Sequence, residues 1–147
     1  MPRRLAVRGI INNGDKLFCV KQRRSDGTIN DFWSTPGGGL EENEGLRDGL
    51  RREIIEETGV VPDIGNLLFI QQFEDDHVEQ LEFFFHIKNS ADFETIDLAA
   101  TSHGILEIES SEFIDPKTET ILPAFLGEVK LPNELETVIA PQVFSYL

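Results

Sequence analysis

The pattern of hydrophobic and polar positions predicts strands on both sides of one central helix. Short apolar or alternating runs bounded by turn-forming residues predict strands at 5–11, 16–21, 32–35, 66–73, 78–88 and 104–108. Residues 45–58 are helix formers without proline, and Gly59 follows where a helix C-cap belongs. A second helix is expected at about 118–128, although Pro123 disfavours its regularity. This order favours an α/β or α+β sandwich with a mixed sheet.

The turns refine this outline. Asn12-Asn13-Gly14-Asp15 contains an Asn-Gly pair, which takes positive φ readily, so 16–21 is expected to return as the hairpin partner of 5–11. The polar run 22–31 is expected to be a loop, and Pro36-Gly37-Gly38-Gly39 a flexible loop that lets the backbone approach a ligand. Residues 74–77 are expected to join two strands.

The length sets the organisation of the chain. A chain of 147 residues that is 39% hydrophobic and has eleven Phe is expected to form a single domain over 1–147 with one core. No stretch reaches the apolar length of a membrane span. The only cysteine, Cys19, lies in the apolar run 17–20 and is interpreted as a core residue. We therefore expect a cytoplasmic protein, either a monomer or a homodimer.

The charge is distributed unevenly along the chain. Residues 1–30 carry seven of the thirteen Lys and Arg against two acids, a net charge of +5, and the other residues carry −19, which together give −14. Such a surface repels polyanions, so binding to nucleic acid or to an anionic membrane is not expected. A small phosphorylated ligand remains compatible, because a divalent cation can bridge it to carboxylates.

Three glutamates of the central helix form an unusual cluster. At about 100° per residue, Leu46, Leu50 and Ile54 make the apolar stripe that faces the sheet. Glu53 and Glu57 lie within a few tens of degrees of that stripe, and Glu56 lies beside it. These carboxylates repel one another at the helix end where the dipole is also negative, so without a cation their pKa values are expected to rise.

Two interpretations of this cluster remain open from the geometry alone. Arg47 and Arg51 lie on the other side of the helix, so Arg52 is the nearby base, and one arginine does not balance three acids. A divalent metal ion does, and the i, i+3, i+4 spacing lets three carboxylates converge on it. The alternative is an ordinary patch of solvated glutamates.

The residues around the cluster complete a longer pattern. It comprises Gly38, Glu44, the run Arg52-Glu53-Ile54, the pair Glu56-Glu57 and the pair Gly59-Val60, with five, seven, one and one residues between them. This pattern over 38–60 resembles the signature of the Nudix (MutT-like) hydrolases at every fixed position. The resemblance implies an α/β/α sandwich and a divalent-metal-dependent enzyme that hydrolyses a nucleoside diphosphate linked to another group.

The resemblance also implies roles for individual residues. Glu53, Glu56 and Glu57 would bind Mg²⁺ or Mn²⁺, with the Gly37 carbonyl oxygen as a further ligand. Arg52 would pair with acidic side chains, Glu44 above all, and hold helix and loop in register. A carboxylate, Glu53 or a distal acid, would take the proton of the attacking water.

The motif itself does not include the distal acid or the bases that would bind phosphate, so these candidates come from other parts of the chain. In many members of the family a glutamate well past the motif reaches back to the site, and Glu107 in the run 105–109 is the best match, with Glu109 and Glu112 as alternatives. Arg23 and Arg24, where the second strand enters a loop, are the first candidates for holding phosphates, and Arg8 is a weaker one. Trp33 could stack on a base, but a core position is the simpler interpretation.

The substrate is inferred from absences. ADP-ribose-hydrolysing members of the family tend to have a proline about fifteen residues beyond Gly59, where this chain has Glu74-Asp75-Asp76. Members acting on dinucleoside polyphosphates tend to have a tyrosine a little further on, and the only tyrosine is Tyr146. A nucleoside or deoxynucleoside triphosphate, cleaved to monophosphate and pyrophosphate, is therefore expected. The alternatives are an ADP-ribose or nucleotide-sugar pyrophosphatase and a non-catalytic nucleotide-sensing module.

Overall fold

The strands form two mixed sheets. The computed structural model describes residues 2–101, 104–132, 134–135 and 140–147. The first sheet has the order β10-β6-β7-β1-β5, with β1 (Arg3–Ile10), β5 (Gly37–Gly39), β6 (Ile64–Asp75), β7 (Val78–Ile87) and β10 (Gln142–Ser145). In it β1 runs parallel to β7 and β10 parallel to β6, whereas the β1–β5 and β6–β7 pairs are antiparallel.

The second sheet is built around β3 (Lys16–Gln22). Its order is β2-β3-β4-β9, and β8 pairs with β3 as well. The other members are β2 (Asn12–Asn13), β4 (Trp33–Ser34), β8 (Ile108–Ile114) and β9 (Ile121–Leu122). Because β9 pairs with β4 and β10 with β6, residues after 119 complete both sheets.

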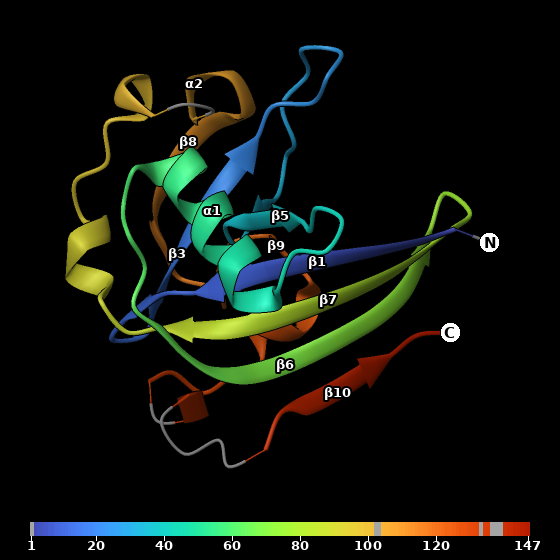
Figure 1. The fold of residues 1–147 in the computed structure, drawn as a ribbon. Helices are drawn as coiled ribbons and strands as arrows, with labels where there is room; N and C mark the ends of the chain where they lie inside the picture. The colour runs from blue at the N-terminus through green and yellow to red at the C-terminus, as the bar shows by residue number, and fades with distance from the viewer. Residues whose placement is uncertain (1, 102–103, 133, 136–139) are drawn as a thin grey trace.

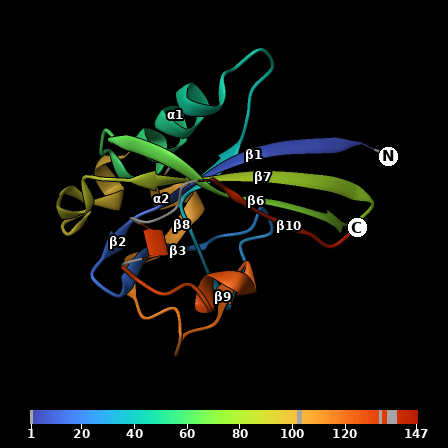
Figure 2. The ribbon, with the colours of Figure 1, turned by 90° about the horizontal axis from the view of Figure 1, so that it is seen from below.

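Two apolar clusters lie on opposite faces of these strands. Helix α1 (Leu46–Thr58) covers one face of the first sheet, and Figure 2 shows it on the side opposite β9. Under the helix, Leu50 and Ile54 are fully buried against a cluster that includes Val7 and Phe85. The other face packs against β9 and the 3₁₀ helix η3 (Ala124–Gly127), with Phe69, Phe84 and Phe125 in contact. The predicted α+β sandwich with mixed sheets is confirmed (Figure 1). The burial of Leu50 and Ile54 also confirms the predicted inward stripe of α1.

The predicted hairpin is correct at its turn but wrong in its partner. Gly14 has φ +61° in the turn, yet β3 pairs before the turn only with the two residues of β2. The main chain changes sheets at Ile10 and Ile11, which are both buried but belong to opposite clusters. Strand β1 therefore pairs with β7 instead of β3.

Three other predicted elements are also corrected. Gly37–Gly39 is the short strand β5 and not a free loop. Residues 104–107 form the one-turn helix α2 (Gly104–Glu107), which the Thr101 hydroxyl caps by accepting a hydrogen bond from the Gly104 N–H at 2.8 Å, and β8 begins only at Ile108. The helix expected at 118–128 is β9 followed by η3, because proline restricts the preceding residue to extended backbone and lacks an N–H.

The remaining described elements are two short 3₁₀ helices, η1 (Ser90–Phe93) and η2 (Leu98–Ala100). Cys19 and Trp33 are buried in the core, as the sequence predicts. Among the described residues, no helix has the length and apolar character needed to cross a membrane.

Candidate active site

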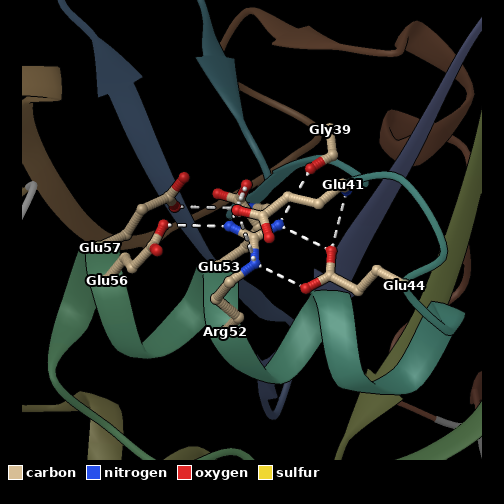
Figure 3. Close-up of polar contacts among 8 residues, drawn as sticks. Gly39, Glu41, Glu44, Arg52, Glu53, Glu56 and Glu57 are labelled. Atoms are coloured by element: carbon tan, nitrogen blue, oxygen red, sulfur yellow. Dashed lines mark hydrogen bonds and ion pairs between the residues drawn. The ribbon is translucent and has the colours of Figure 1, made fainter.

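Arg52 lies at the centre of the acidic cluster on α1 and binds it together. Its Nε and Nη2 donate to the two carboxylate oxygens of Glu44 at 2.7 and 2.9 Å. Its Nη1 donates to Glu53 Oε1 at 3.1 Å and to Glu56 Oε2 at 3.2 Å. Its Nη2 also donates to the Gly39 carbonyl oxygen at 3.2 Å (Figure 3). These contacts account for all five N–H groups of the guanidinium and tie α1 to β5 and to the loop before the helix.

The pairing of β5 with β1 turns alternate backbone groups of β5 toward the helix. The Gly9 N–H donates to Pro36 and the Leu40 N–H to Leu5, so the hydrogen-bonded positions of β5 alternate through Gly38. In an antiparallel pair the residues between those positions point both N–H and C=O away from the partner strand. Consistent with this, the Gly37 N–H donates to Glu57 Oε2 at 3.3 Å and the Gly39 carbonyl accepts from Arg52. The Gly37 carbonyl therefore faces the same side as Glu57.

Two of these positions are too close to their neighbours for a side chain, Gly37 to the backbone and Gly38 to the movable end of Glu53. Gly37 has φ +143°, and a Cβ there would lie 2.0 Å from the Val7 carbonyl oxygen. At Gly38 a Cβ would lie 2.6 Å from the Glu53 carboxylate. The glycines thus let β5 lie against β1 and let Glu53 lie over the strand.

Glu57 and Glu53 are the two acids whose protonation the site perturbs upward. Glu57 is 2% exposed, and burial raises its pKa to about 8, with the charges of Glu53 and Glu107 acting in the same direction and Arg8 opposing them. Burial also raises the pKa of Glu53, against the Arg52 guanidinium. The rise expected from the sequence is therefore present for these two acids, but its first cause is burial and not mutual repulsion. Glu44 shows the opposite effect, because hydrogen bonds from Arg52 lower its pKa to about 2.

The carboxylates do not yet converge on a common point. Among the described residues, no three side chains of the His, Cys, Asp and Glu types are gathered closely enough to hold a metal ion as they stand. Glu53 and Glu56 are turned toward the same Arg52 nitrogen (Figure 3). Glu57 instead accepts from the Gly37 N–H. The donor set of carboxylates and a backbone carbonyl nevertheless suits Mg²⁺ or Mn²⁺. The charged forms of Glu53 and Glu57, which burial disfavours, are the forms that a cation would stabilise.

Glu107 lies near the cluster, at the end of α2. Its charge acts on both Glu53 and Glu57 and raises the pKa of each. Of the two alternatives, Glu109 forms an ion pair with Arg23, and Glu112 lines a separate cavity beside Phe93 and Phe113. Glu107 is thus the acid of this group that the structure brings close to the helix cluster.

The basic residues of the adjacent cavity differ from the first candidates. A cavity of about 510 Å³ opens on the first sheet, and the arginines on its wall are Arg4 and Arg8. Arg23 and Arg24 do not line it. Arg23 pairs with Glu109, and Arg24 donates to Asn30 Oδ1 at 2.6 Å. Arg8 instead lies opposite Gly37 in the β1–β5 pair, and its charge lowers the pKa of Glu57. Arg8 therefore links the cavity to the carboxylate cluster.

Several residues of the cavity wall were missed from the sequence. They include amides, aromatic rings and one buried acid, namely Gln71, Phe73, Gln80, Glu82, Phe32 and Tyr146. Polar residues at inward-facing strand positions could have revealed these wall residues. Gln80, Glu82 and the buried Phe84 are two residues apart on β7 and so share one face of the sheet. Tyr146 reaches the cavity because β10 pairs with β6, which sequence distance from the motif could not indicate.

Comparison with known proteins gives one family. The model described as NUDIX domain matches residues 2–119. Over 54 residues, 37% of this chain and 41% of the relative, the chain is 41% identical to an 8-oxo-dGTP diphosphatase of Buchnera aphidicola. Over 71 residues, 48% of this chain and 41% of the relative, it is 34% identical to an ADP-ribose pyrophosphatase of Methanocaldococcus jannaschii. The matched segments span about two fifths of the length of these curated relatives.

The fold is also that of a solved structure. The solution structure of the Escherichia coli ORF135 protein matches with a TM-score of 0.66 and 20% sequence identity, covering 86% of this chain and 85% of that one. At this identity the likeness concerns the fold alone. The two curated relatives have different substrates in their names, so the comparisons do not determine which nucleotide this chain binds.

Proposed function

The chain belongs to the Nudix family, and on that premise we propose that it is a pyrophosphohydrolase that uses a divalent metal ion to cleave a nucleoside diphosphate linked to another group. The observation that carries this proposal is the set of inward carboxylates on α1, held by Arg52 beside the strand β5. We further propose that residues 1–147 act as one hydrolase domain.

The metal ion would be held by Glu53, Glu56 and Glu57 with the Gly37 carbonyl oxygen. When bound, Mg²⁺ or Mn²⁺ neutralises the negative charge of the diphosphate and of the carboxylates. Arg52 keeps Glu44 and Gly39 in place, because a bidentate arginine–carboxylate pair fixes orientation as well as charge.

Hydrolysis adds water across the phosphoanhydride. The water oxygen bonds to phosphorus, the bridging P–O bond breaks, and a carboxylate, Glu53 or Glu107, takes the water proton. Burial raises the pKa of Glu53, which makes its carboxylate a stronger base than an exposed glutamate. Arg8 and Arg4, the arginines on the cavity wall, would hold phosphate oxygens in place of Arg23 and Arg24.

Among substrates we propose a nucleoside or deoxynucleoside triphosphate, cleaved to monophosphate and pyrophosphate. The similarity to a relative named 8-oxo-dGTP diphosphatase supports it. The relative named ADP-ribose pyrophosphatase keeps ADP-ribose and nucleotide sugars as the second candidates. A cytoplasmic location and a monomeric or homodimeric state remain predictions from the sequence.

A substrate screen tests the proposal. Nucleoside triphosphates, ADP-ribose and nucleotide sugars are incubated with the protein and Mg²⁺, and the products are resolved by chromatography. We expect monophosphate and pyrophosphate from a triphosphate, and no turnover in EDTA. Turnover that survives complete chelation would overturn the metal dependence, and binding without turnover of any class would favour a sensing module.

The variant Glu53→Gln provides the matched test of the site. It removes one charge without changing side-chain size, so turnover is expected to fall by roughly 10² to 10⁴-fold while the melting temperature is retained. Glu42→Gln, an exposed acid in the loop before α1, is the charge-matched control. Normal turnover in Glu53→Gln would move the reacting centre away from α1.

A further inference from the structure

Three side chains on neighbouring strands hold one another on the cavity wall. Glu82 of β7 lies between Arg8 of β1 and Gln71 of β6. Its Oε2 accepts from Arg8 Nε at 3.0 Å, and its Oε1 accepts from Gln71 Nε2 at 3.1 Å. Gln71 and Glu82 are direct cross-strand partners, and each is 6% exposed. The three side chains therefore form a hydrogen-bonded row across the floor of the cavity, with Gln71 and Glu82 buried and Arg8 partly buried.

This row fixes the orientation of the Gln71 amide. A carboxylate in an ion pair offers only acceptors, so the amide must turn its NH₂ toward Glu82. Arg8 cannot release Glu82 easily, because its Nη1 also donates to the Thr35 carbonyl at 3.1 Å. The Gln71 carbonyl oxygen then points away from Glu82. No group among the described residues donates a hydrogen bond to it, and Gln71 lines the cavity.

The position of Gln71 matches the base end of a nucleotide. The phosphate end belongs with α1 and β5, and β6 is three strands away from β5 in the sheet. At about 4.8 Å per strand this separation is about 14 Å. The wall of the same cavity also carries the rings of Phe32, Phe73 and Tyr146, on which a base can stack.

Resting on the proposed function, we propose that Gln71 is a specificity-determining residue that selects bases with an exocyclic amino group, and that Glu82 and Arg8 are its positioning residues. The fixed carbonyl oxygen accepts a hydrogen bond from a 6-amino purine or a 4-amino pyrimidine. With a 6-oxo or 4-oxo base, the base carbonyl oxygen faces the Gln71 carbonyl oxygen, and neither oxygen receives a hydrogen bond. Polar sites reject ligands most strongly when they leave buried polar groups unpaired in this way.

The test uses pairs of nucleotides that differ only in this group. We compare kcat/KM for dATP with dITP and for dCTP with dUTP, and the equilibrium binding of the matching monophosphates by calorimetry. In the wild type the amino member is expected to be favoured about 10- to 100-fold, mainly through KM. A wild type that treats both members alike, or prefers the oxo member, overturns the proposal.

Two variants separate selection from positioning. Gln71→Met removes the acceptor and is expected to bring the amino-to-oxo ratio close to one. Glu82→Gln keeps the shape but can donate as well as accept, so the Gln71 amide is free to turn, and the amino-to-oxo ratio is expected to fall. The control is Gln72→Met, since Gln72 does not line the cavity and donates to Glu79. A ratio unchanged in Gln71→Met contradicts the proposal.

The binding arm keeps this inference apart from the proposed function. Monophosphate binding requires no catalysis, so an amino preference in binding without turnover would overturn the hydrolase and support the role of Gln71. Turnover without any preference for amino bases would support the hydrolase and overturn the role of Gln71.

Discussion

At the scale of the residue, the negative charge of the site is reduced in two ways, by ion pairing with Arg52 and by protonation of a buried acid. Arg52 neutralises the acids within its reach, and Glu44, which receives two of its hydrogen bonds, keeps a pKa of about 2. Within the described part of the chain, Glu57 accepts one hydrogen bond, from the Gly37 N–H at 3.3 Å, and burial in the protein interior raises its pKa to about 8. Without a metal ion Glu57 is therefore mainly protonated at neutral pH, and its protonation changes as the pH rises toward 8.

The first prediction concerns this acid and the pH dependence of stability. Between the unfolded value of 4.5 and about 8, folded Glu57 holds a proton that the unfolded chain has released. The unfolding free energy of the metal-free protein is therefore expected to fall as pH rises through that window, by on the order of a few kcal/mol. Urea unfolding in EDTA measures it, and Glu57→Gln is expected to lose less than the wild type.

Glu42→Gln is the control, because it removes an exposed acid of equal charge. It is expected to follow the wild-type slope. If Glu57→Gln also follows that slope, then Glu57 titrates near its ordinary value and its interior position has no electrostatic consequence.

At the scale of the element, α1 and β5 act as one unit. The C-cap Gly59, with φ +76°, ends α1 one turn beyond Glu56, and the N-cap Gly45 begins it one residue after Glu44. Because Arg52 donates both to Glu44 and to Gly39, the helix cannot shift along the strand without losing those bonds. Two of the three glycines of β5, Gly37 and Gly38, have separate functions in this unit.

A pair of alanine substitutions tests that separation. Gly37→Ala places a Cβ against the Val7 carbonyl at a φ that L-residues rarely adopt, so it is expected to destabilise the fold by about 2 kcal/mol or more. Gly38→Ala instead displaces the Glu53 carboxylate, which is the end of a flexible side chain. It is expected to reduce turnover at least tenfold with less than about 1 kcal/mol lost in stability. Thermal unfolding and steady-state kinetics on both variants measure the two effects, and equal losses of stability would contradict the assignment.

The elements also show how far sequence reasoning reaches. The helix at 45–58 and its inward acids were predictable because the helical period repeats more than three times over the thirteen residues of α1. The strand predicted at 104–108 was wrong because the four residues 104–107 fit a helical turn equally well. The hydrogen bond from the Gly104 N–H to the Thr101 hydroxyl favours the helical turn. Gly37–Gly39 was expected to be a loop because glycine has low strand propensity, whereas pairing with β1 imposes the strand. Arg4, Gln71 and Glu82 were missed because only the sheet order brings their strands together.

At the scale of the whole molecule, the net charge of −14 sets the background against which any cation acts. Much of that charge lies on exposed side chains, where salt of any kind screens it. A specific site differs from this background because it is absent from the unfolded chain, so its ligand stabilises only the folded state.

The last prediction uses this difference. Mg²⁺ is expected to raise the melting temperature of the wild type by several degrees with a saturable dependence, and that of Glu56→Gln/Glu57→Gln by much less. In EDTA the double variant is expected to melt above the wild type, because it removes a buried ionisable acid. Glu42→Gln/Glu119→Gln, which removes two exposed acids, controls for net charge. NaCl at matched ionic strength controls for screening, and an equal response to NaCl would show that the carboxylates are a solvated patch.

The parallel pairing of β1 with β7 has a consequence for the order of folding. Arg3 pairs with Glu79 and Ile10 with His86, so the two strands must close a loop of about 75 residues. By contrast, β6 and β7 meet across a tight turn in which Asp76 and His77 have positive φ. Such a hairpin closes on the microsecond scale, whereas non-local pairing is slow. We expect β6–β7 to form early and to serve as the template for β1. Since β5 pairs only with β1 among the described strands, we expect the glycine strand and the helix acids to come together late, so that the carboxylate cluster assembles near the end of folding.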